Sequence, residues 1–381
     1  MEKNKAYLVL ENGTVFEGKS FGYAPEEDSA SDITILKDNP YDVLGEIVFT
    51  TAMTGYLETL TDPSYYGQIV IQTFPLIGNY GIIPADFESS HPQLKAYIVR
   101  EWCQEPSNFR QEGLLDTFLK TNRIPGIYDI DTRALTKLVR EYGVMNGKLV
   151  HQKPMVSEII AEIKNYVVVD AVSSVTCKEQ TMYNTPESKF KVVLWDFGAK
   201  ENIKRELLKR NCDVVVVPSF TTAEEILKLN PDGLMLSNGP GDPQENTGVI
   251  KELQKLCLKK LPIFGICLGH QLLALAQGAK TEKLKYGHRG ANQPAVDINT
   301  GRVYITSQNH GYAVINDSLP DYAQANFLNG NDNTCEGIKY ENMPVFSVQF
   351  HPEASAGPLD TNFLFDQFIE TMQGGKNNAV K

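Results

Sequence analysis

Cys267 lies between two glycines in the segment Gly265–Gly269. This spacing is typical of a nucleophile elbow, in which small flanking residues allow a sharp turn that lifts a reactive side chain above the end of a strand. A helix that begins directly after the cysteine would favour the thiolate, and the backbone N–H of Leu268 could point at an oxyanion. The alternative, a buried structural thiol, is the interpretation we adopt for Cys212 and Cys257.

A base for this nucleophile is offered by the sequence His351-Pro-Glu353, which follows the apolar run 345–350. In an extended chain, residues two apart point to the same side, so Glu353 could orient His351. By itself the pattern would more often be a polar turn that ends a strand. Together with the elbow it predicts an amide-hydrolysing site in which His351 is the base for Cys267.

A Gly-Pro-Gly turn follows the apolar run that ends at Leu236. Gly239 and Gly241 would allow a ligand to approach the backbone closely, and the turn could offer a second N–H to an oxyanion. A different glycine motif, Gly13–Ser20, fits the phosphate-loop pattern letter for letter. That loop must follow a strand and open a helix, whereas residues 13–20 are strand-like, so we predict no nucleotide site there.

The elements that must position these residues follow one another regularly after residue 190. Buried strands alternating with amphipathic helices predict a doubly wound, mostly parallel sheet, with Cys267 at a turn from strand to helix. We predict this α/β domain to span residues 190–373, with a tail at 374–381. The expected strands are 191–195, 213–217, 233–236, 262–266 and 345–350, and the expected helices are 200–210, 223–229, 249–260 and 270–277.

Residues 1–150 have the pattern of a separate mixed α+β domain. The dipeptide Asn12-Gly13 between two apolar runs predicts a hairpin. Strands are expected at residues 45–49 and 68–71, and the apolar residues of 131–140 have helical spacing. The composition of the acidic segment 23–43 is typical of an inserted loop. We predict that residues 151–189, with one helix near 155–163, form a linker region.

Composition narrows the classes of function. The 381 residues carry a formal net charge of −11, which disfavours binding to nucleic acid or to an anionic membrane. No apolar run approaches the roughly 18 residues that a membrane span needs, so we expect a cytoplasmic protein. The six cysteines form no C-x-x-C pair, which indicates free thiols and no metal site.

The cysteine, histidine–glutamate and Gly-Pro-Gly motifs together resemble those of the class I (triad) glutamine amidotransferases. Within that class, the chain is similar to the small, glutaminase subunits of carbamoyl-phosphate synthetase. The resemblance extends over nearly the whole chain, and its further matching stretches are 48–49, 53–56, 60–65, 78–79, 129–133 and 195–203.

The resemblance implies a glutaminase. Cys267 would attack the amide of L-glutamine and form a γ-glutamyl thioester, His351 would transfer protons, and Glu353 would orient His351. Bound glutamine would contact Ser64, Gly239, Gly241, Leu268, Gln271, Asn309, Gly311 and Tyr312. The chain departs from the family pattern in the length of its acidic insertion at 23–43 and in Tyr312, where a phenylalanine is expected.

The resemblance also implies a partner. Ammonia would pass to a separate large synthetase subunit, which would hold ATP and a divalent cation and build carbamoyl phosphate from bicarbonate for pyrimidine synthesis, arginine synthesis or both. This chain would need no cofactor of its own. Two alternatives remain: a stand-alone cysteine hydrolase of γ-glutamyl substrates, and a catalytically inactive scaffold that stabilises a partner.

Overall fold

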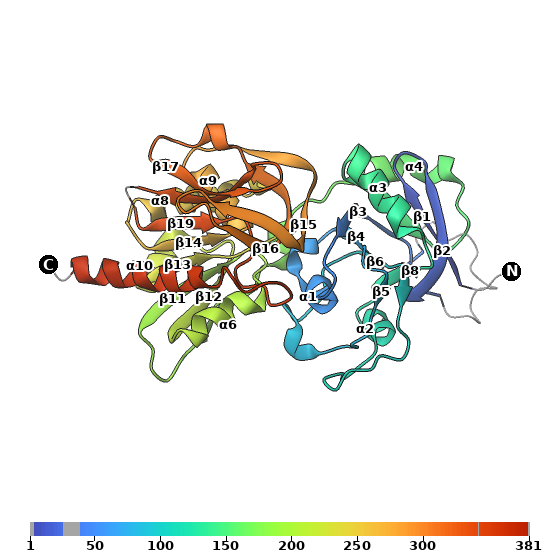
Figure 1. Ribbon diagram of the computed structural model, residues 1–381, viewed down its shortest axis with the longest axis horizontal. Coiled ribbons are helices and arrows are strands. Elements are labelled where there is room, and N and C mark those ends of the chain that lie inside the picture. The colour runs from blue at the N-terminus through green and yellow to red at the C-terminus, as the bar shows by residue number, and fades with distance from the viewer. Residues whose placement is uncertain (1–3, 26–38, 342, 380–381) are drawn as a thin grey trace. The chain divides into compact units, whose positions relative to one another are not determined.

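The computed structural model describes residues 4–25, 39–341 and 343–379. The chain divides into two compact units, Met1–Val169 and Asp170–Lys381 (Figure 1). Each unit has hydrophobic clusters of its own, so each is described by itself.

The first unit is built on a closed barrel with the strand order β1-β2-β8-β6-β4-β3-β9. Its strands are β1 (Lys5–Leu10), β2 (Val15–Gly22), β3 (Val43–Thr50), β4 (Gln68–Gln72), β6 (Ala96–Ile98), β8 (Pro125–Tyr128) and β9 (Met145–Val150). Its helices are α1 (Tyr56–Thr61), α2 (Leu115–Thr121), α3 (Thr132–Tyr142) and α4 (Val156–Lys164), and β5 (Leu76–Ile77) pairs with β7 (Glu101–Trp102).

The predicted hairpin is present, because β1 and β2 pair antiparallel on either side of a turn at Gly13. The segment that resembles a phosphate loop runs into β2, and a Cβ at Gly18 would lie 2.6 Å from the backbone oxygen of Tyr128. The segment is therefore strand and not a loop that opens a helix. Of the predicted acidic insertion at 23–43, residues 26–38 lie outside the described residues.

The second unit contains a ten-stranded sheet of order β10-β12-β11-β13-β14-β19-β18-β17-β15-β16 within the described residues. Its strands are β10 (Thr181–Tyr183), β11 (Phe190–Asp196), β12 (Cys212–Pro218), β13 (Gly233–Leu236), β14 (Ile263–Ile266), β15 (Thr281–Asp297), β16 (Val303–Val314), β17 (Ala323–Asn329), β18 (Cys335–Tyr340) and β19 (Val345–Val348). Its helices are α5 (Ala171–Val175), α6 (Glu201–Lys209), α7 (Ala223–Lys228), α8 (Thr247–Cys257), α9 (Leu268–Ala276) and α10 (Phe363–Ala379).

The centre of this sheet is parallel and covered on both faces. Strands β12, β11, β13, β14 and β19 pair in parallel, and their side chains belong to two separate cores. One core contains side chains of α7, α8 and α9, and the other contains side chains of α6 and α10. The predicted doubly wound α/β architecture is confirmed.

Half of the sheet was not predicted. Strands β15 to β18 form an antiparallel extension that joins the parallel part where β18 pairs with β19, and β16 is its outermost strand. No local pattern in the sequence predicts an element in these residues, although they include Asn309, Gly311 and Tyr312.

Two predicted boundaries were wrong. Residues 151–189 are not a linker region but are divided between the units. Ile163 of α4 packs with Tyr7 and Val9 in the first unit, whereas β10 pairs with β12 in the second. Residues 374–379 are not a tail, because α10 continues through them to Ala379.

Within the described residues, no helix combines the length and the apolar character that are needed to cross a membrane.

Candidate active site

Cys267 occupies the turn between β14 and α9 with φ 53° and ψ −105°, a backbone conformation that is uncommon for a residue with a side chain. The turn leaves no room for Cβ atoms on either side. A Cβ at Gly265 would lie 2.9 Å from the backbone of Gly269, and one at Gly269 would lie 2.5 Å from the Leu236 oxygen. Both glycines are therefore required for the tight turn that presents Cys267.

His351 and Glu353 lie together in the interior. The Nδ1 atom of His351 donates a hydrogen bond of 2.7 Å to Oε1 of Glu353, and both side chains are fully buried. Nε2, the other ring nitrogen, is buried and has no hydrogen-bond partner among the described residues. This is the arrangement that a base and its orienting carboxylate require.

Lys200 is a charged neighbour that the sequence analysis did not single out. Its Nζ atom lies 3.5 Å from Oε1 of Glu353. Burial and the Lys200 charge oppose protonation of His351, but Glu353 and Cys267 outweigh them and raise the pKa of His351 above its usual value. Burial acts to raise the pKa of Glu353, but His351 and Lys200 lower it well below its usual value. Both shifts favour the charged forms, a protonated ring beside a carboxylate.

Asn202 holds the backbone of Glu353 in place, since its side-chain amide donates to the backbone oxygen of that residue. Both Lys200 and Asn202 come from the start of α6, within the stretch 195–203 that matched the family pattern. That match was the one sequence signal for them, because a lysine or asparagine at a helix start usually faces solvent.

Strand β16 runs past Cys267, His351 and Gln271. Three backbone oxygens of this strand accept hydrogen bonds from these residues. Ser307 O accepts from the His351 backbone N–H at 2.9 Å, and Asn309 O accepts from the Cys267 sulfur at 3.7 Å. Tyr312 O accepts from the side-chain amide of Gln271 at 2.8 Å. Asn309 and Tyr312 are therefore brought beside Cys267 together with Gln271, and Gly311 lies between them on the same strand.

The Gly-Pro-Gly turn lies on another side of the nucleophile. A Cβ at Gly239 would meet the Phe197 backbone oxygen and would lie 2.8 Å from the Leu268 side chain, so only glycine fits there. The turn is anchored by the hydrogen bond that Gly269 N donates to Ser237 O at 3.0 Å. Gly241 has φ +86°, which glycine adopts without strain.

Leu268 is the first residue of α9, so its backbone N–H has no acceptor within its own helix. Ser64, in contrast, belongs to the first unit. It lies in the 3₁₀ turn Pro63–Tyr65, is 8% exposed and donates its backbone N–H to Asp62. Its role in glutamine binding stays a prediction.

Comparison with known proteins covers both units. Residues 8–149 match the family model for the carbamoyl-phosphate synthase small chain, CPSase domain, and residues 193–371 match the model for glutamine amidotransferase class-I. The carbamoyl phosphate synthase small chain of a Bacillus cereus strain is 51% identical over 376 residues, 98% of each chain. That of Clostridium perfringens (strain 13 / Type A) is 49% identical over 366 residues, 96% of this chain and 99% of the relative.

A third relative, the carbamoyl phosphate synthase small chain of Fusobacterium nucleatum subsp. nucleatum, is 52% identical over 370 residues, 96% of this chain and 97% of the relative. These matches run from the barrel strands through the Cys267 turn to the His351–Glu353 pair. The chain accordingly belongs to the family of carbamoyl phosphate synthase small chains, and its second unit carries that family's class I glutamine amidotransferase domain.

Proposed function

We propose that this chain hydrolyses L-glutamine to glutamate and ammonia at Cys267 and delivers the ammonia to a large synthetase subunit, which makes carbamoyl phosphate. The observation that carries the proposal is the conjunction of Cys267 on a strained turn with the buried His351–Glu353 pair. Family membership gives the substrate, because class I amidotransferase domains act on glutamine.

The chemistry follows from the positions of the side chains. The Cys267 sulfur attacks the side-chain carbonyl carbon of glutamine, and the N–H groups of Leu268 and Gly239 stabilise the oxyanion. The C–N bond breaks as His351 gives a proton to the departing ammonia, which leaves a γ-glutamyl thioester. Water then attacks the thioester, His351 accepts its proton, and the sulfur leaves with glutamate released.

The remainder of the substrate would be held by β16 and by the turns around the nucleophile. Asn309, Gly311 and Tyr312 lie on the strand whose edge faces Cys267, and Gln271 lies one helical turn after it. Gly241 permits close approach of the ligand from the Gly-Pro-Gly turn. Ser64 would add a contact from the first unit.

ATP and a divalent cation belong on the large subunit in this proposal. Two observations support that division of labour. The relatives are small chains by name, and the segment that resembles a phosphate loop forms strand β2. We therefore propose a heteromeric enzyme in which this chain supplies ammonia and binds no cofactor.

The test replaces the nucleophile and compares two nitrogen sources. In the complex reconstituted with the large subunit, Cys267→Ser should abolish carbamoyl phosphate synthesis from glutamine and leave synthesis from ammonia within about twofold of the wild type, because only the first route needs the thiol. Loss of both activities would mean that the cysteine is structural. Rapid glutamine turnover by the isolated chain, unchanged on adding the large subunit, would instead favour a stand-alone hydrolase.

A further inference from the structure

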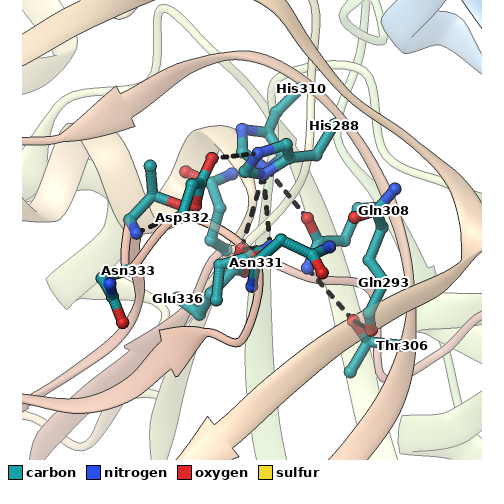
Figure 2. A network of polar contacts seen from close by, with 12 residues as sticks. His288, Gln293, Thr306, Gln308, His310, Asn331, Asp332, Asn333 and Glu336 are labelled. Atoms are coloured by element: carbon teal, nitrogen blue, oxygen red, sulfur yellow. Dashed lines mark hydrogen bonds and ion pairs between the residues drawn. The ribbon is translucent and has the colours of Figure 1, made fainter.

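A network of polar side chains joins β15, β16 and β18 in the antiparallel extension of the second unit, and its two histidines and Glu336 are buried (Figure 2). His288 on β15 and His310 on β16 are directly paired across the two strands, and their rings meet edge to face with centroids 5.0 Å apart. Glu336 reaches the same place from β18, and Asp332 from the turn before it.

His288 lies between the two carboxylates. Its Nε2 atom donates to Asp332 at 2.9 Å, and its Nδ1 atom lies 3.6 Å from Oε1 of Glu336. Burial opposes protonation of His288, but the two carboxylates outweigh it and raise the pKa of the ring. Glu336 is wholly buried, and this burial raises the pKa of its carboxyl group, although His288 and the Asn329 amide, which donates to it at 2.8 Å, favour the charged form.

His310 connects this ion pair to the strand that faces Cys267. Burial, together with the neighbouring His288 charge, lowers the pKa of His310, so the ring is neutral. Its Nδ1–H donates to the Tyr312 backbone oxygen at 2.8 Å. The same oxygen accepts from Gln271, whose backbone N–H donates to Cys267 O. The Tyr312 carbonyl is thus held from the network side and from the nucleophile side at once.

We infer that His288 and Glu336 are positioning residues for glutamine. Glu336 and Asp332 fix the His288 ring, His288 fixes the His310 ring, and His310 sets the position of the β16 segment 309–312 beside Cys267. Neither His288 nor Glu336 needs to touch the substrate. The inference rests on the proposed function, because it assigns these two side chains a part in glutamine binding by β16.

The test uses His288→Asn and Glu336→Gln in the complex with the large subunit. Each variant should raise KM for glutamine by about fivefold or more, the equivalent of a lost hydrogen bond, while kcat per active site stays within about twofold. Active sites are counted by labelling Cys267 with a glutamine-like electrophile. Because the two residues act in series, the double variant should raise KM no further than the more severe single variant.

Lys339→Gln is the matched control, because Lys339 is an exposed residue of β18 and its replacement also changes the charge by one. It should leave KM unchanged, and synthesis from ammonia should be unchanged in every variant. Should the variants lower the labelled fraction or the melting temperature at unaltered KM, the network is merely structural and the inference is wrong. If the wild type itself does not hydrolyse glutamine, it is the proposed function that fails.

Metal analysis of the wild-type complex gives an independent check. His288, His310 and Glu336 have potential ligand atoms within 4.8 Å of one another. The inference would be overturned if the complex contained one equivalent of zinc and if a chelator removed both the zinc and the glutamine-dependent activity. The same side-chain atoms would then coordinate a metal. Full activity without a stoichiometric metal supports the hydrogen-bonded network.

Discussion

The backbone of Cys267 combines a positive φ with a strongly negative ψ, which costs on the order of 1–3 kcal/mol for a residue with a side chain. The surrounding hydrogen bonds hold it there, since Cys267 N donates to Val348 O at 2.9 Å and Gln271 N donates back to Cys267 O. Such strain is typical of a nucleophile that must project above its sheet.

Glu353 sets both the orientation and the charge of His351. In Glu353→Gln, burial and Lys200 continue to oppose protonation of His351, and of the two groups that favoured it only Cys267 remains. The pKa of His351 should therefore fall, and the ring should lose its second proton at a lower pH than in the wild type. NMR titration of isotope-labelled histidine measures this shift.

The same variant should lower kcat for glutamine by about 10²- to 10⁴-fold, because the base is no longer held in one tautomer and orientation. Glu341→Gln removes an exposed carboxylate and should change neither the titration nor the rate. An unshifted His351 titration in Glu353→Gln would contradict the electrostatic role given to Glu353.

Among the elements, the turn between β14 and α9 depends most directly on its glycines. Gly265→Ala places a Cβ 2.9 Å from backbone atoms of Gly269 that cannot move away without opening the turn. We expect a loss of about 1–3 kcal/mol in the free energy of unfolding and slower labelling of Cys267. Chemical denaturation and electrophile labelling measure the two effects.

Gly248→Ala serves as the comparison, because Gly248 lies near the start of α8 with nothing within 4 Å of its missing Cβ. This variant should be neutral or more stable by up to about 1 kcal/mol, as expected for alanine in a helix. If both substitutions changed the free energy of unfolding equally, the close packing around Gly265 would not be the reason that glycine is required there.

The elements around Cys267 were predictable because each has a local pattern. Strand β14 is a continuous apolar run, and α9 is an apolar helix that ends at Ala276, two residues before Gly278. Strand β15, in contrast, mixes lysine, histidine and arginine with glycine, and its apolar residues do not alternate. Its stability comes from pairing with β16 and from ion pairs such as that of buried His288 with exposed Asp332, neither of which is visible in a single stretch of sequence.

At the scale of the whole molecule, the division at residues 169 and 170 predicts which fragment folds by itself. Residues 170–381 should form a stable unit, whereas 190–381 should be less stable by about 2–4 kcal/mol. The shorter fragment lacks β10, and it lacks Thr176 and Cys177, which bond to Asp196 at 2.6 Å each. Denaturation of the two purified fragments measures the difference.

A matched full-length variant tests the same contacts. Thr176→Val removes the hydroxyl that donates to Asp196 O and accepts from Ser219 N, and it should reproduce part of the loss seen on shortening the fragment. Equal stability of both fragments would show that residues 170–189 add nothing to the fold of the second unit. The weak apolar pattern of 151–189 concealed this boundary, because the contacts are made by isolated side chains such as Ile163 and Thr176 and by the backbone of the short strand β10.

The edge position of β16 has a consequence for solubility. The outermost strand of a sheet presents unpaired peptide groups on which another chain can form a further strand. Here oxygens along that edge are occupied by His351, Cys267 and Gln271. The catalytic centre therefore also shields the sheet against self-association, and a change that frees β16 would expose this protein to aggregation as well as to loss of activity.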